Sequence, residues 1–493
     1  MKICLIDAAA INTRRFLPHW TPLGLAYIAA MLEQDGHEVL IIERDVLFRK
    51  NRLNIKKVDF LMGKMVQKFN PNLIGMSSST ELFPDIINAA RILKTILPDV
   101  PIVYGGHHAS ALPIDILKIC NDIDVVAIGE GESIMWELAA NIPKKDIKGI
   151  CFRKGDTFIT TPPRPPIEPL DSLPLPARHL LDMEFYTKPS PNTIRNLTLK
   201  TTTMLTSRGC PFSCKFCVES LPMGKKHRIH STHRVIEELE GILSNYEVEA
   251  IYFLDEGFLT NEARVRELCE IMIKDGYNKR VKWSAQVRVD ALDQDLLKLM
   301  KEAGCIQLEC GFETASDRLL KTVDKKTSQQ KNREIVRLIK SAGIRCFAYI
   351  IAGLPGETEE EFQASIDFIK TSGIDAVAFA RFVPHPGSIF YNELTQKGML
   401  PERFWQAGGK YYNQLNFSAI PDERAKALYE QAWDKRVYPL NQKDRMKHTS
   451  FPQLMKRICS PELVYRVLNE PSSLLRSLRN WIQLKLTKVF CPN

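Results

Sequence analysis

Short apolar segments alternate with helical patterns through the first part of this 493-residue chain. Apolar runs typical of buried strands occur at 2–6, 39–42, 73–76, 102–104 and 124–128. Helical spacing of apolar residues is found between them, near 85–97 and 132–141. Buried strands that alternate with helices favour a parallel sheet with helices on both faces. The sequence therefore predicts an α/β fold that begins with a doubly wound, Rossmann-like parallel sheet.

The same alternation continues in the middle of the chain with a longer repeat. Strand-like runs occur at 202–207, 250–255, 281–288, 305–313, 345–353 and 375–384. Six such βα units predict a partial (β/α)6 barrel of the TIM type, in which ligands bind at the carboxyl ends of the strands. From about position 400 the pattern becomes helical and irregular, which predicts a helical C-terminal region.

A proline-rich stretch separates the two patterns. Residues 160–176 read TTPPRPPIEPLDSLPLP, a composition that disfavours regular helix or sheet and is typical of an extended connector. The predicted organisation has four consecutive parts: a ligand-binding domain at 1–150, a proline-rich linker at 151–195, a barrel at 196–400, and a helical region at 401–493.

The composition is that of an ordinary folded protein, with 44% hydrophobic and 25% charged residues. Lys and Arg number 67 against 58 for Asp and Glu, so the formal net charge of +9 allows anionic partners without requiring nucleic acid. An apolar run of about 18 residues, the length that spans a bilayer, is not found, and the first residues lack the pattern of a signal peptide. These features predict a cytoplasmic protein.

Three of the twelve cysteines differ from the others in their spacing. Cys210, Cys214 and Cys217 form a CxxxCxxC motif directly after the first barrel strand, whereas most of the remaining nine lie in apolar runs and are interpreted as buried side chains. Structural zinc usually has four protein ligands, while an iron-sulfur cluster held by three cysteines leaves one iron open. A zinc site is the alternative, with a fourth ligand from the nearby His227, His230 or His233.

On these residues the middle of the chain resembles the radical S-adenosylmethionine superfamily. The resemblance includes the cysteine motif and, in the expected order, segments 251–258, 311–314, 351–358 and 383–388. It implies that Cys210, Cys214 and Cys217 hold a 4Fe-4S cluster whose open iron binds S-adenosylmethionine, which one electron then cleaves to a 5'-deoxyadenosyl radical. It also implies S-adenosylmethionine contacts at Phe216, Asp255, Glu256, Arg288, Glu313 and Gly353.

A structural role remains the alternative for several of these side chains. The carboxylates of Asp255, Glu256 and Glu313 are also suited to salt bridges at the barrel rim. The guanidinium of Arg288 has a nearby partner along the chain in Asp290. The sequence leaves both interpretations open.

The first domain resembles the cobalamin-binding domain that precedes the barrel in one large branch of this superfamily. The matching segments are 21–25, 36–39, 105–108 and 129–132. The DxHxxG sequence that supplies an axial histidine in cobalamin mutases is absent, as in many members of this branch, so neither His107 nor His108 is assigned as the lower ligand. The resemblance implies cobalamin contacts at Thr21, Gly24, Ser78, Gly105, Gly106, His107, Gly129, Glu130, Gly131 and Glu132.

The resemblance implies a radical enzyme that methylates an unactivated carbon with a methyl group from methylcobalamin, with flavodoxin or ferredoxin as electron donor and its acid and base residues unassigned. An oxidative cyclase or rearrangement enzyme with the same two-domain layout is one alternative. A non-catalytic cobalamin- or metal-binding protein is an alternative of another class. A tRNA methylthiotransferase is disfavoured, because that family expects three more cluster cysteines in its first domain.

The last predicted helix has a basic amphipathic character. Residues 471–490 contain Arg476, Arg479, Lys485 and Lys488 and no acidic residue, and their apolar side chains fall near one face. Such a helix can lie in a membrane interface. The sequence thus predicts a small-molecule substrate of lipid or isoprenoid type and peripheral contact with the inner face of the membrane, with packing against the barrel as the alternative.

Overall fold

The apolar runs of the first part form a seven-stranded sheet with the order β2-β1-β3-β4-β5-β6-β7. Its strands are β1 (Lys2–Asp7), β2 (Glu38–Glu43), β3 (Leu73–Ser77), β4 (Ile102–Gly105), β5 (Val125–Ala127), β6 (Ile150–Lys154) and β7 (Thr157–Thr160). The first five strands are parallel, and their order is that of a doubly wound sheet. The predicted Rossmann-like sheet is therefore confirmed.

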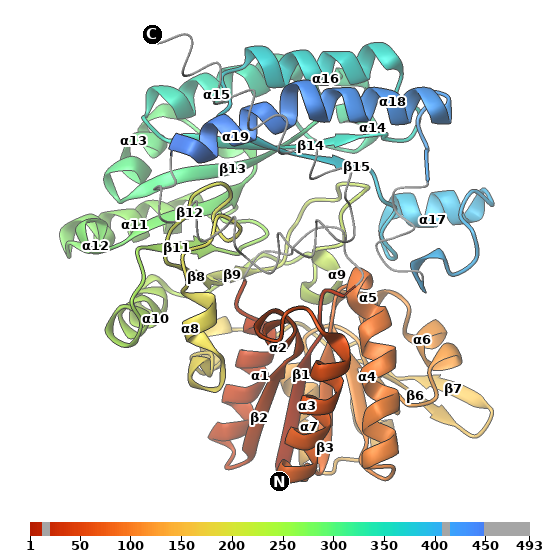
Figure 1. The fold of residues 1–493 in the computed structure, drawn as a ribbon. Helices are drawn as coiled ribbons and strands as arrows, with labels where there is room; N and C mark the ends of the chain where they lie inside the picture. Colours follow the sequence, from red (N-terminus) through yellow and green to blue (C-terminus); the bar gives the residue numbers. More distant parts are fainter. Residues whose placement is uncertain (12–19, 407–414, 448–493) are drawn as a thin grey trace.

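Helices cover both faces of this sheet in the computed structural model, which describes residues 1–11, 20–406 and 415–447 (Figure 1). They are α1 (Leu23–Gln34), α2 (Arg44–Lys50), α3 (Ile55–Phe69), α4 (Phe83–Ile96), α5 (His107–Ala111), α6 (Pro113–Ile119) and α7 (Glu132–Ala139). Leu5 packs in the core on one face of the sheet, while its neighbours Cys4 and Ile6 pack in the core on the other. Burial on both faces explains why the strands are apolar throughout.

The far edge of the sheet differs from the prediction. Strands β6 and β7 pair antiparallel and extend the sheet to Thr160, beyond the predicted domain limit at position 150. Side chains of β7 are half-buried or exposed, so its sequence lacks the apolar run that marks the inner strands. The proline-rich residues that follow form an irregular connector with short turns, because proline has no amide hydrogen for a helix or a ladder.

The second unit is a six-stranded parallel sheet with the order β15-β14-β13-β12-β11-β8. Its strands are β8 (Thr201–Met204), β11 (Ala250–Phe253), β12 (Lys282–Val287), β13 (Cys305–Glu313), β14 (Arg345–Ala352) and β15 (Ala376–Arg381). Each lies within a predicted strand-like run, apart from one residue at the start of β8. Because β8 and β15 form the two ends of a sheet with consecutive neighbours, the predicted partial (β/α)6 barrel is confirmed.

Most helices of the second unit pack on the outer face of the barrel and enclose its main hydrophobic core, whereas Phe390 and Leu394 of its last long helix belong to a separate apolar cluster. The longer helices are α10 (Thr232–Asn245), α11 (Glu262–Lys274), α13 (Gln294–Glu302), α15 (Gln329–Ser341), α16 (Glu359–Thr371) and α17 (Ile389–Gln396). Short helices are α8 (Met183–Tyr186), α9 (Ser220–Met223), α12 (Tyr277–Arg280) and α14 (Asp317–Thr322). The six longer ones begin at a Ser, Asn, Asp or Thr whose side chain accepts a backbone N–H of the first turn, which is the usual N-cap.

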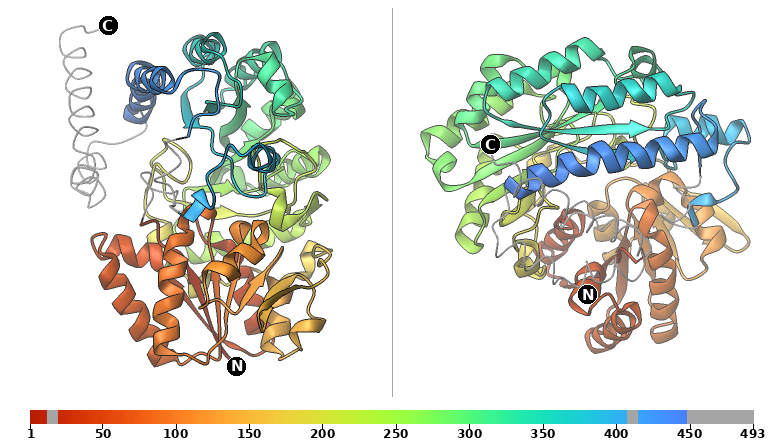
Figure 2. Two further views of the ribbon diagram at one scale, coloured as in Figure 1. Left: turned by 90° about the vertical axis from the view of Figure 1, so that its right-hand side faces the viewer. Right: turned by 45° about the horizontal axis from the view of Figure 1, so that its top comes forward.

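Two C-terminal helices lie across the barrel (Figure 2). Helices α18 (Asp422–Ala432) and α19 (Tyr438–Lys447) are joined by a π-helical turn (Trp433–Val437). The side-chain amide of Asn441 accepts from the Val377 N–H at 2.9 Å and donates to the Val377 carbonyl at 2.8 Å. Helix α19 thereby satisfies an edge position of β15, as a further strand would.

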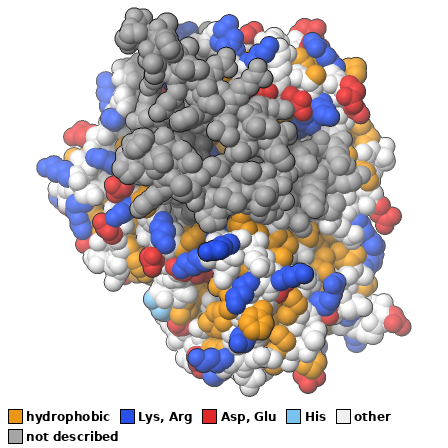
Figure 3. Space-filling view, viewed as in Figure 1, with side chains coloured by type: hydrophobic (Ala, Val, Ile, Leu, Met, Phe, Trp, Pro, Cys, Tyr) orange, Lys and Arg blue, Asp and Glu red, His pale blue; other side chains and the backbone are white. Residues whose placement is uncertain are grey.

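The helical character of the C-terminal region is confirmed up to Lys447, while the basic stretch 471–490 lies outside the described residues. Within the described ranges, every helix is too short or too polar to span a bilayer. On the face seen in Figure 3, hydrophobic side chains lie among lysines and arginines over the first unit. Helix α3 contributes Phe60, which is 53% exposed, with the ammonium groups of Lys57 and Lys64 over its ring.

The two units are stacked so that the carboxyl ends of the first sheet face the barrel. Short helix α9, which follows the cysteine motif, packs against α5 of the first unit. A Cβ atom added at Gly129 would lie 3.6 Å from the Pro222 carbonyl oxygen of α9. The loops predicted to hold cobalamin and the loop predicted to hold the cluster therefore meet at this junction.

Candidate functional site

The cysteine loop leaves the barrel through a tightly packed glycine. Gly209 has φ = 87°, and a Cβ atom there would lie 2.3 Å from the Lys226 carbonyl oxygen, so only glycine fits. Its N–H donates to Glu256 Oε2 at 2.8 Å. The base of the loop is the antiparallel pair β9 (Ser207–Arg208) and β10 (Arg228–Ile229). This arrangement sets the direction in which Cys210 and the rest of the loop project.

The thiols of Cys210, Cys214 and Cys217 are half-buried neighbours. Burial raises the pKa of the Cys210 and Cys217 thiols, and the proximity of Cys214 raises both further. Among the described residues, no group of three or more ligating side chains converges on one point that a single metal ion would occupy. Three neighbouring thiols on one loop, without a fourth ligand, fit a cluster with one open iron better than mononuclear zinc.

The histidines considered for zinc have other surroundings. His230 is bonded through Nδ1 to Asp171 Oδ1 at 2.9 Å. Burial lowers the pKa of His227 and of His230. Neither ring joins the motif cysteines in a group of converging ligands among the described residues, so the structure gives no support to a fourth zinc ligand at His227 or His230.

Arg288 is paired with Asp290, one of the two interpretations that the sequence left open, and it also lies beside a motif cysteine. Its Nη2 lies 2.9 Å from Asp290 Oδ2, while Nη1 lies 3.5 Å from Cys214 Sγ, and the guanidinium stacks 3.5 Å from the centroid of the Phe212 ring. The ion pair with Asp290 thus holds a cation beside a predicted cluster ligand. Phe216 packs partly buried in an apolar group that includes Leu354 and Phe382.

Asp255 and Glu256 support the cysteine loop from the end of β11. Asp255 is buried and accepts from Thr206 N at 3.1 Å, from Thr206 Oγ1 at 2.8 Å, and from Ser207 Oγ. Burial, followed by the charge of Glu219, raises the pKa of Glu256 to about 8. Asp255 thus holds the strand before the motif, and Glu256 holds the backbone of Gly209.

Glu313 forms a buried ion pair at the carboxyl end of β13. Its Oε1 lies 2.8 Å from Lys325 Nζ, and each side chain is 7% exposed. Glu313 has φ = 63°, a conformation uncommon for a residue with a side chain. A Cβ atom at Gly311 would lie 2.9 Å from Lys325 Nζ, so glycine at that position leaves space for the pair.

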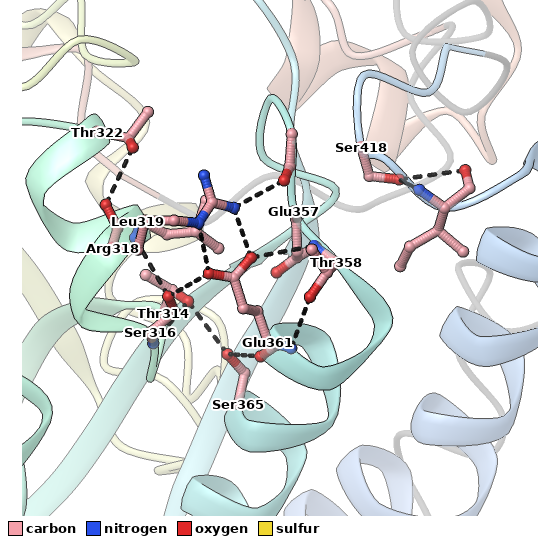
Figure 4. A network of polar contacts seen from close by, with 12 residues as sticks. Thr314, Ser316, Arg318, Leu319, Thr322, Glu357, Thr358, Glu361, Ser365 and Ser418 are labelled. Atoms are coloured by element: carbon pink, nitrogen blue, oxygen red, sulfur yellow. Dashed lines mark hydrogen bonds and ion pairs between the residues drawn. The ribbon is translucent and has the colours of Figure 1, made fainter.

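Gly353 begins a turn that a polar network holds in place (Figure 4). Its N–H donates to Glu357 Oε2 at 2.5 Å, and burial raises the pKa of Glu357 to about 7. Beyond the turn, Glu361 accepts from Arg318 Nε at 2.9 Å and from Ser316 Oγ at 2.6 Å, and forms a capping box with Thr358. The network fixes the backbone at the end of β14.

In the first unit, Gly106 lies directly against the end of β3. A Cβ atom at Gly106, where φ is 101°, would lie 2.9 Å from the Ser78 carbonyl oxygen. Ser78 Oγ is hydrogen-bonded to Tyr104 Oη at 2.8 Å. Gly105 has more space, since a Cβ atom there would lie 3.6 Å from Ala127 Cβ. These three predicted cobalamin residues come together at one edge of the sheet.

The two histidines of the same loop point to different surroundings. His107 Nε2 lies 3.3 Å from Glu219 Oε2, two residues after the last motif cysteine. His108 is fully buried with its Nδ1 3.1 Å from Thr80 Oγ1, and burial lowers its pKa to about 3. His107 therefore joins the first unit to the cysteine loop, whereas His108 is a neutral core side chain.

His107 and Glu219 form a partly exposed ion pair between the units. Their side chains are 35% and 53% exposed to solvent. Burial opposes the charged forms, but their mutual attraction outweighs it, so the pKa of His107 is raised and that of Glu219 is lowered. The pair therefore places two opposite charges within reach of solvent, beside the cysteine loop.

Glu130 and Glu132 form ion pairs with two arginines of the barrel unit. Arg208 Nη1 lies 2.8 Å from Glu130 Oε1, and Arg208 Nη2 lies 2.7 Å from Glu132 Oε1. Arg228 Nη1 lies 3.0 Å from both oxygens of Glu130. We call these four side chains, all between 2% and 4% exposed, the junction network.

The remaining predicted cobalamin residues lie near the same junction. Thr21 is buried, and its Oγ1 lies 3.1 Å from Thr202 Oγ1 of β8. A Cβ atom at Gly131 would lie 3.0 Å from Ile28 Cδ1, while Gly24 has open space around it. Sequence reasoning missed Arg208 and Arg228; the position of Arg208, directly before Gly209 and the motif, was the available signal.

A doubly wound domain whose strand ends face the three-cysteine loop of a partial barrel defines a two-domain radical enzyme. The radical SAM superfamily model matches residues 204–369, and the B12 binding domain model matches residues 10–139. The chain belongs to the radical SAM superfamily, in the branch that carries a B12-binding domain before the radical SAM domain. The predicted family and the cofactor set of 4Fe-4S cluster, S-adenosylmethionine and cobalamin are thereby confirmed.

Similar proteins include methyltransferases and a cyclase. An uncharacterised methyltransferase of Pyrococcus horikoshii is 33% identical over 392 residues, which are 78% of this chain and 81% of the relative. An anaerobic magnesium-protoporphyrin IX monomethyl ester cyclase of Rubrivivax gelatinosus is 28% identical over 392 residues, 77% of this chain and 67% of the relative.

One solved structure has the same fold over most of the chain. It is the radical S-adenosylmethionine methyltransferase TsrM from Kitasatospora setae with cobalamin and a [4Fe-4S] cluster bound. The TM-score is 0.67 at 16% identity, and the match covers 92% of this chain and 89% of that one. These similarities support the predicted enzyme class.

Proposed function

We propose that the protein is a cobalamin-dependent radical S-adenosylmethionine methyltransferase that methylates an unactivated carbon of a small-molecule substrate. The observation that carries the proposal is the meeting of the cysteine loop and the Gly105–Gly106 loop at the junction of the two units, where His107 pairs with Glu219 at 3.3 Å. Bound there, the cluster supplies the electron that cleaves S-adenosylmethionine, and cobalamin supplies the methyl group.

The residues of the chain hold and separate these groups. Cys210, Cys214 and Cys217 bind the cluster, and Arg288 keeps a positive charge 3.5 Å from Cys214 Sγ. Glu256 keeps the backbone of Gly209 in place below the loop.

We assign the predicted contacts to two groups. Gly105, Gly106, Gly129 and His107 lie at the strand ends that face the barrel, and we propose them as cobalamin contacts together with the backbone of Ser78. Glu130 and Glu132 already bind Arg208 and Arg228, so we propose that they join the two units. The S-adenosylmethionine contacts of Phe216, Glu313 and Gly353 stay predictions.

The proposal also includes the electron donor of the enzyme and its place in the cell. A reduced flavodoxin or ferredoxin is the proposed donor, since the chain's three-cysteine motif provides for one cluster. Membrane contact through residues 471–490, with a lipid or isoprenoid substrate, stays a prediction from the sequence because this stretch lies outside the described residues.

An oxidative cyclase is the second candidate, and the similarity to the Rubrivivax gelatinosus cyclase over 77% of this chain favours it. Its reaction uses the same cleavage of S-adenosylmethionine but transfers no methyl group. The products of S-adenosylmethionine distinguish the two candidates. Methylation yields 5'-deoxyadenosine and S-adenosylhomocysteine, whereas cyclisation yields 5'-deoxyadenosine alone.

The experiment is an anaerobic assay of the reconstituted protein with S-adenosylmethionine carrying a deuterated methyl group, a chemical reductant and a metabolite extract. Methyltransfer predicts a deuterated methyl group in one extract component, with 5'-deoxyadenosine and S-adenosylhomocysteine formed together. Formation of 5'-deoxyadenosine without methylated product would overturn the proposal in favour of the cyclase.

Substitution of one cysteine controls this assay. Cys214→Ala is expected to abolish the visible absorbance of the cluster and the cleavage of S-adenosylmethionine while cobalamin binding remains. Cys269→Ala, at a buried cysteine of α11, is expected to leave all three properties in place. Cluster formation and cleavage that survive in Cys214→Ala would contradict the assignment of the motif.

A further inference from the structure

A second arginine–glutamate group lies inside the barrel. Arg195, from the segment before β8, donates through Nε to Tyr349 Oη at 2.8 Å, and its Nε lies 3.5 Å from Glu309 Oε2. Tyr252 Oη donates to Glu309 at 3.0 Å, as does Tyr349 Oη. We call Arg195, Glu309, Tyr252 and Tyr349 the barrel network.

Glu309 is fully satisfied within this network. It is 0% exposed, and besides the two tyrosines it accepts from Gln307 Nε2 at 3.0 Å and from the backbone N–H of Arg195 at 3.2 Å. Four donors thus satisfy the hydrogen-bonding capacity of this carboxylate. The carboxylate thus orients Arg195 through the Nε side of the guanidinium and leaves the other side of that group available.

The two terminal nitrogens of Arg195 have no acceptor among the described residues. The faces of Trp20, Phe347 and Tyr349 surround the guanidinium, with centroids 5.9, 5.9 and 5.4 Å from its carbon. The side chain is 30% exposed. The guanidinium therefore lies among aromatic faces and remains within reach of solvent.

Trp20 supplies a further donor without an acceptor. Its indole stacks on Tyr252, with ring centroids 6.0 Å apart and an interplanar angle of 12°. Its Nε1 is buried and makes no hydrogen bond within the described part of the chain. Buried donors normally have partners, and each one left without a partner costs free energy. An indole N–H and a guanidinium end both lack acceptors, and the guanidinium carbon lies 5.9 Å from the centroid of the indole ring. This pairing of unfilled donors indicates a ligand that supplies the acceptors.

We propose that Arg195 and Trp20 form a subsite that binds an anionic group of the substrate, either a carboxylate or a phosphoryl group. The terminal nitrogens of a guanidinium match two oxygens of either group, and the aromatic faces strengthen the interaction by limiting solvent. The inference rests on the proposed function and narrows its substrate class to small acids or phosphate and phosphonate esters. In this arrangement the barrel unit recognises the substrate, and the cofactors bind at the junction between the two units.

The test measures binding of benzoate, phenylphosphonate and neutral benzamide to the reconstituted holoenzyme by anaerobic isothermal titration calorimetry. The wild type is expected to bind at least one of the two anions, and Arg195→Gln to weaken that binding about tenfold or more. Preference for benzoate indicates a carboxylate substrate, and preference for phenylphosphonate indicates a phosphoryl group. Anion affinities unchanged in Arg195→Gln, or benzamide bound as tightly as benzoate, would overturn the subsite.

Two further variants separate binding from folding. Arg345→Gln alters a nearby arginine that is already bonded to Gln307 and Asp444, and it is expected to keep the wild-type anion affinity. Trp20→Phe keeps the stacked ring but removes the N–H, and it is expected to weaken anion binding about threefold to tenfold. Equal losses in Arg345→Gln and Arg195→Gln would show a structural effect and overturn the assignment.

The cofactor content of the variant shows whether the bound anionic group belongs to the substrate or to a cofactor. Cobalamin and S-adenosylmethionine stoichiometries are expected to be the same in Arg195→Gln and in the wild type. A loss of either cofactor that parallels the loss of anion binding would assign Arg195 to that cofactor and overturn the substrate subsite. Failure of methyl transfer with intact, Arg195-dependent anion binding would instead count against the proposed function alone.

Discussion

The junction network and the barrel network use the same residue types differently. In the junction network, every terminal nitrogen of Arg208 and Arg228 has an acceptor, and all four side chains are at most 4% exposed. In the barrel network, only Nε of Arg195 is bonded to a described side chain, and the side chain is 30% exposed. The first arrangement joins two units, whereas the second leaves donors for a ligand.

The difference follows from the cost of burying charge. A guanidinium removed from water is tolerated only when carboxylates and carbonyls replace its hydration. Arg208 and Arg228 meet this condition at their terminal nitrogens through protein partners, although the Nε of each is buried without a partner among the described residues. Arg195 retains access to solvent, so its terminal nitrogens do not need protein acceptors in the ligand-free state. Pairing of both terminal nitrogens with protein groups is therefore a sign of a structural role, and unpaired terminal nitrogens of an accessible arginine are a sign of binding.

The largest expected effect comes from removing the shared carboxylate of the junction network. Glu130→Leu leaves Arg208 and Arg228 close together with fewer buried counter-charges, and the free energy of unfolding is expected to fall by about 3–5 kcal/mol. Urea denaturation of the cofactor-free protein measures this change. Glu359→Leu, which breaks an exposed pair with Arg424, is the control and is expected to change stability little. Equal losses of stability in Glu130→Leu and Glu359→Leu would show that the buried junction network stabilises the protein no more than an exposed ion pair does.

The buried carboxyl of Glu357 in the barrel unit allows the comparison to be extended to the pH dependence of stability. Burial raises the pKa of Glu357 to about 7, above its unfolded value of 4.5, so between these values the folded protein holds a proton that the unfolded chain has lost. Stability therefore falls as pH rises through this window, by about 3 kcal/mol. Glu357→Gln removes this dependence, and its stability relative to the wild type is expected to increase from pH 5 to pH 8.

Denaturation of both proteins at several pH values measures the Glu357 effect. Wild type and Glu357→Gln are expected to show their greatest difference at pH 8 and their smallest at pH 5. A constant difference over this range would show that the Glu357 carboxyl does not titrate differently in the folded state.

A smaller change is expected when the barrel network loses its arginine. Arg195→Gln removes a cation from beside Glu309, but four neutral donors still satisfy that carboxylate, so the free energy of unfolding is expected to fall by about 1 kcal/mol. The same urea experiment measures it. A loss as large as that in Glu130→Leu would mean that Arg195 is a structural residue like Arg208.

A similarly small effect is expected at a neutral contact between the units. Thr21→Val removes the hydrogen bond between the hydroxyls of Thr21 and Thr202 and keeps a similar shape, so stability is expected to fall by about 0.5–1.5 kcal/mol. A thermal shift assay with and without cobalamin measures it. A larger loss only with cobalamin present would show that Thr21 contacts the cofactor rather than the barrel.

Most of the fold was predictable from local sequence patterns. The parallel strands of the first unit coincide with apolar runs because they are buried on both faces, and those of the barrel coincide with strand-like runs. The CxxxCxxC spacing marks the cluster loop regardless of its surroundings. The hairpin of β6 and β7 was not predicted, since its partly exposed edge strand has no apolar run. The cofactor contacts were predicted by resemblance, and for Glu130 and Glu132 the structure shows bonds to arginines that no local pattern reveals.

The sequence by itself determined the order of strands and helices, the position of the three-thiol loop and the class of enzyme, because these depend on residues close together in the chain. Only the tertiary structure decided which charges meet. Glu130 and Arg208 are 78 positions apart, and Arg195 and Tyr349 are 154 positions apart. Such pairs form only when packing of the two cores places distant segments side by side, and that packing decides whether an arginine is paired or left facing the space where a ligand binds.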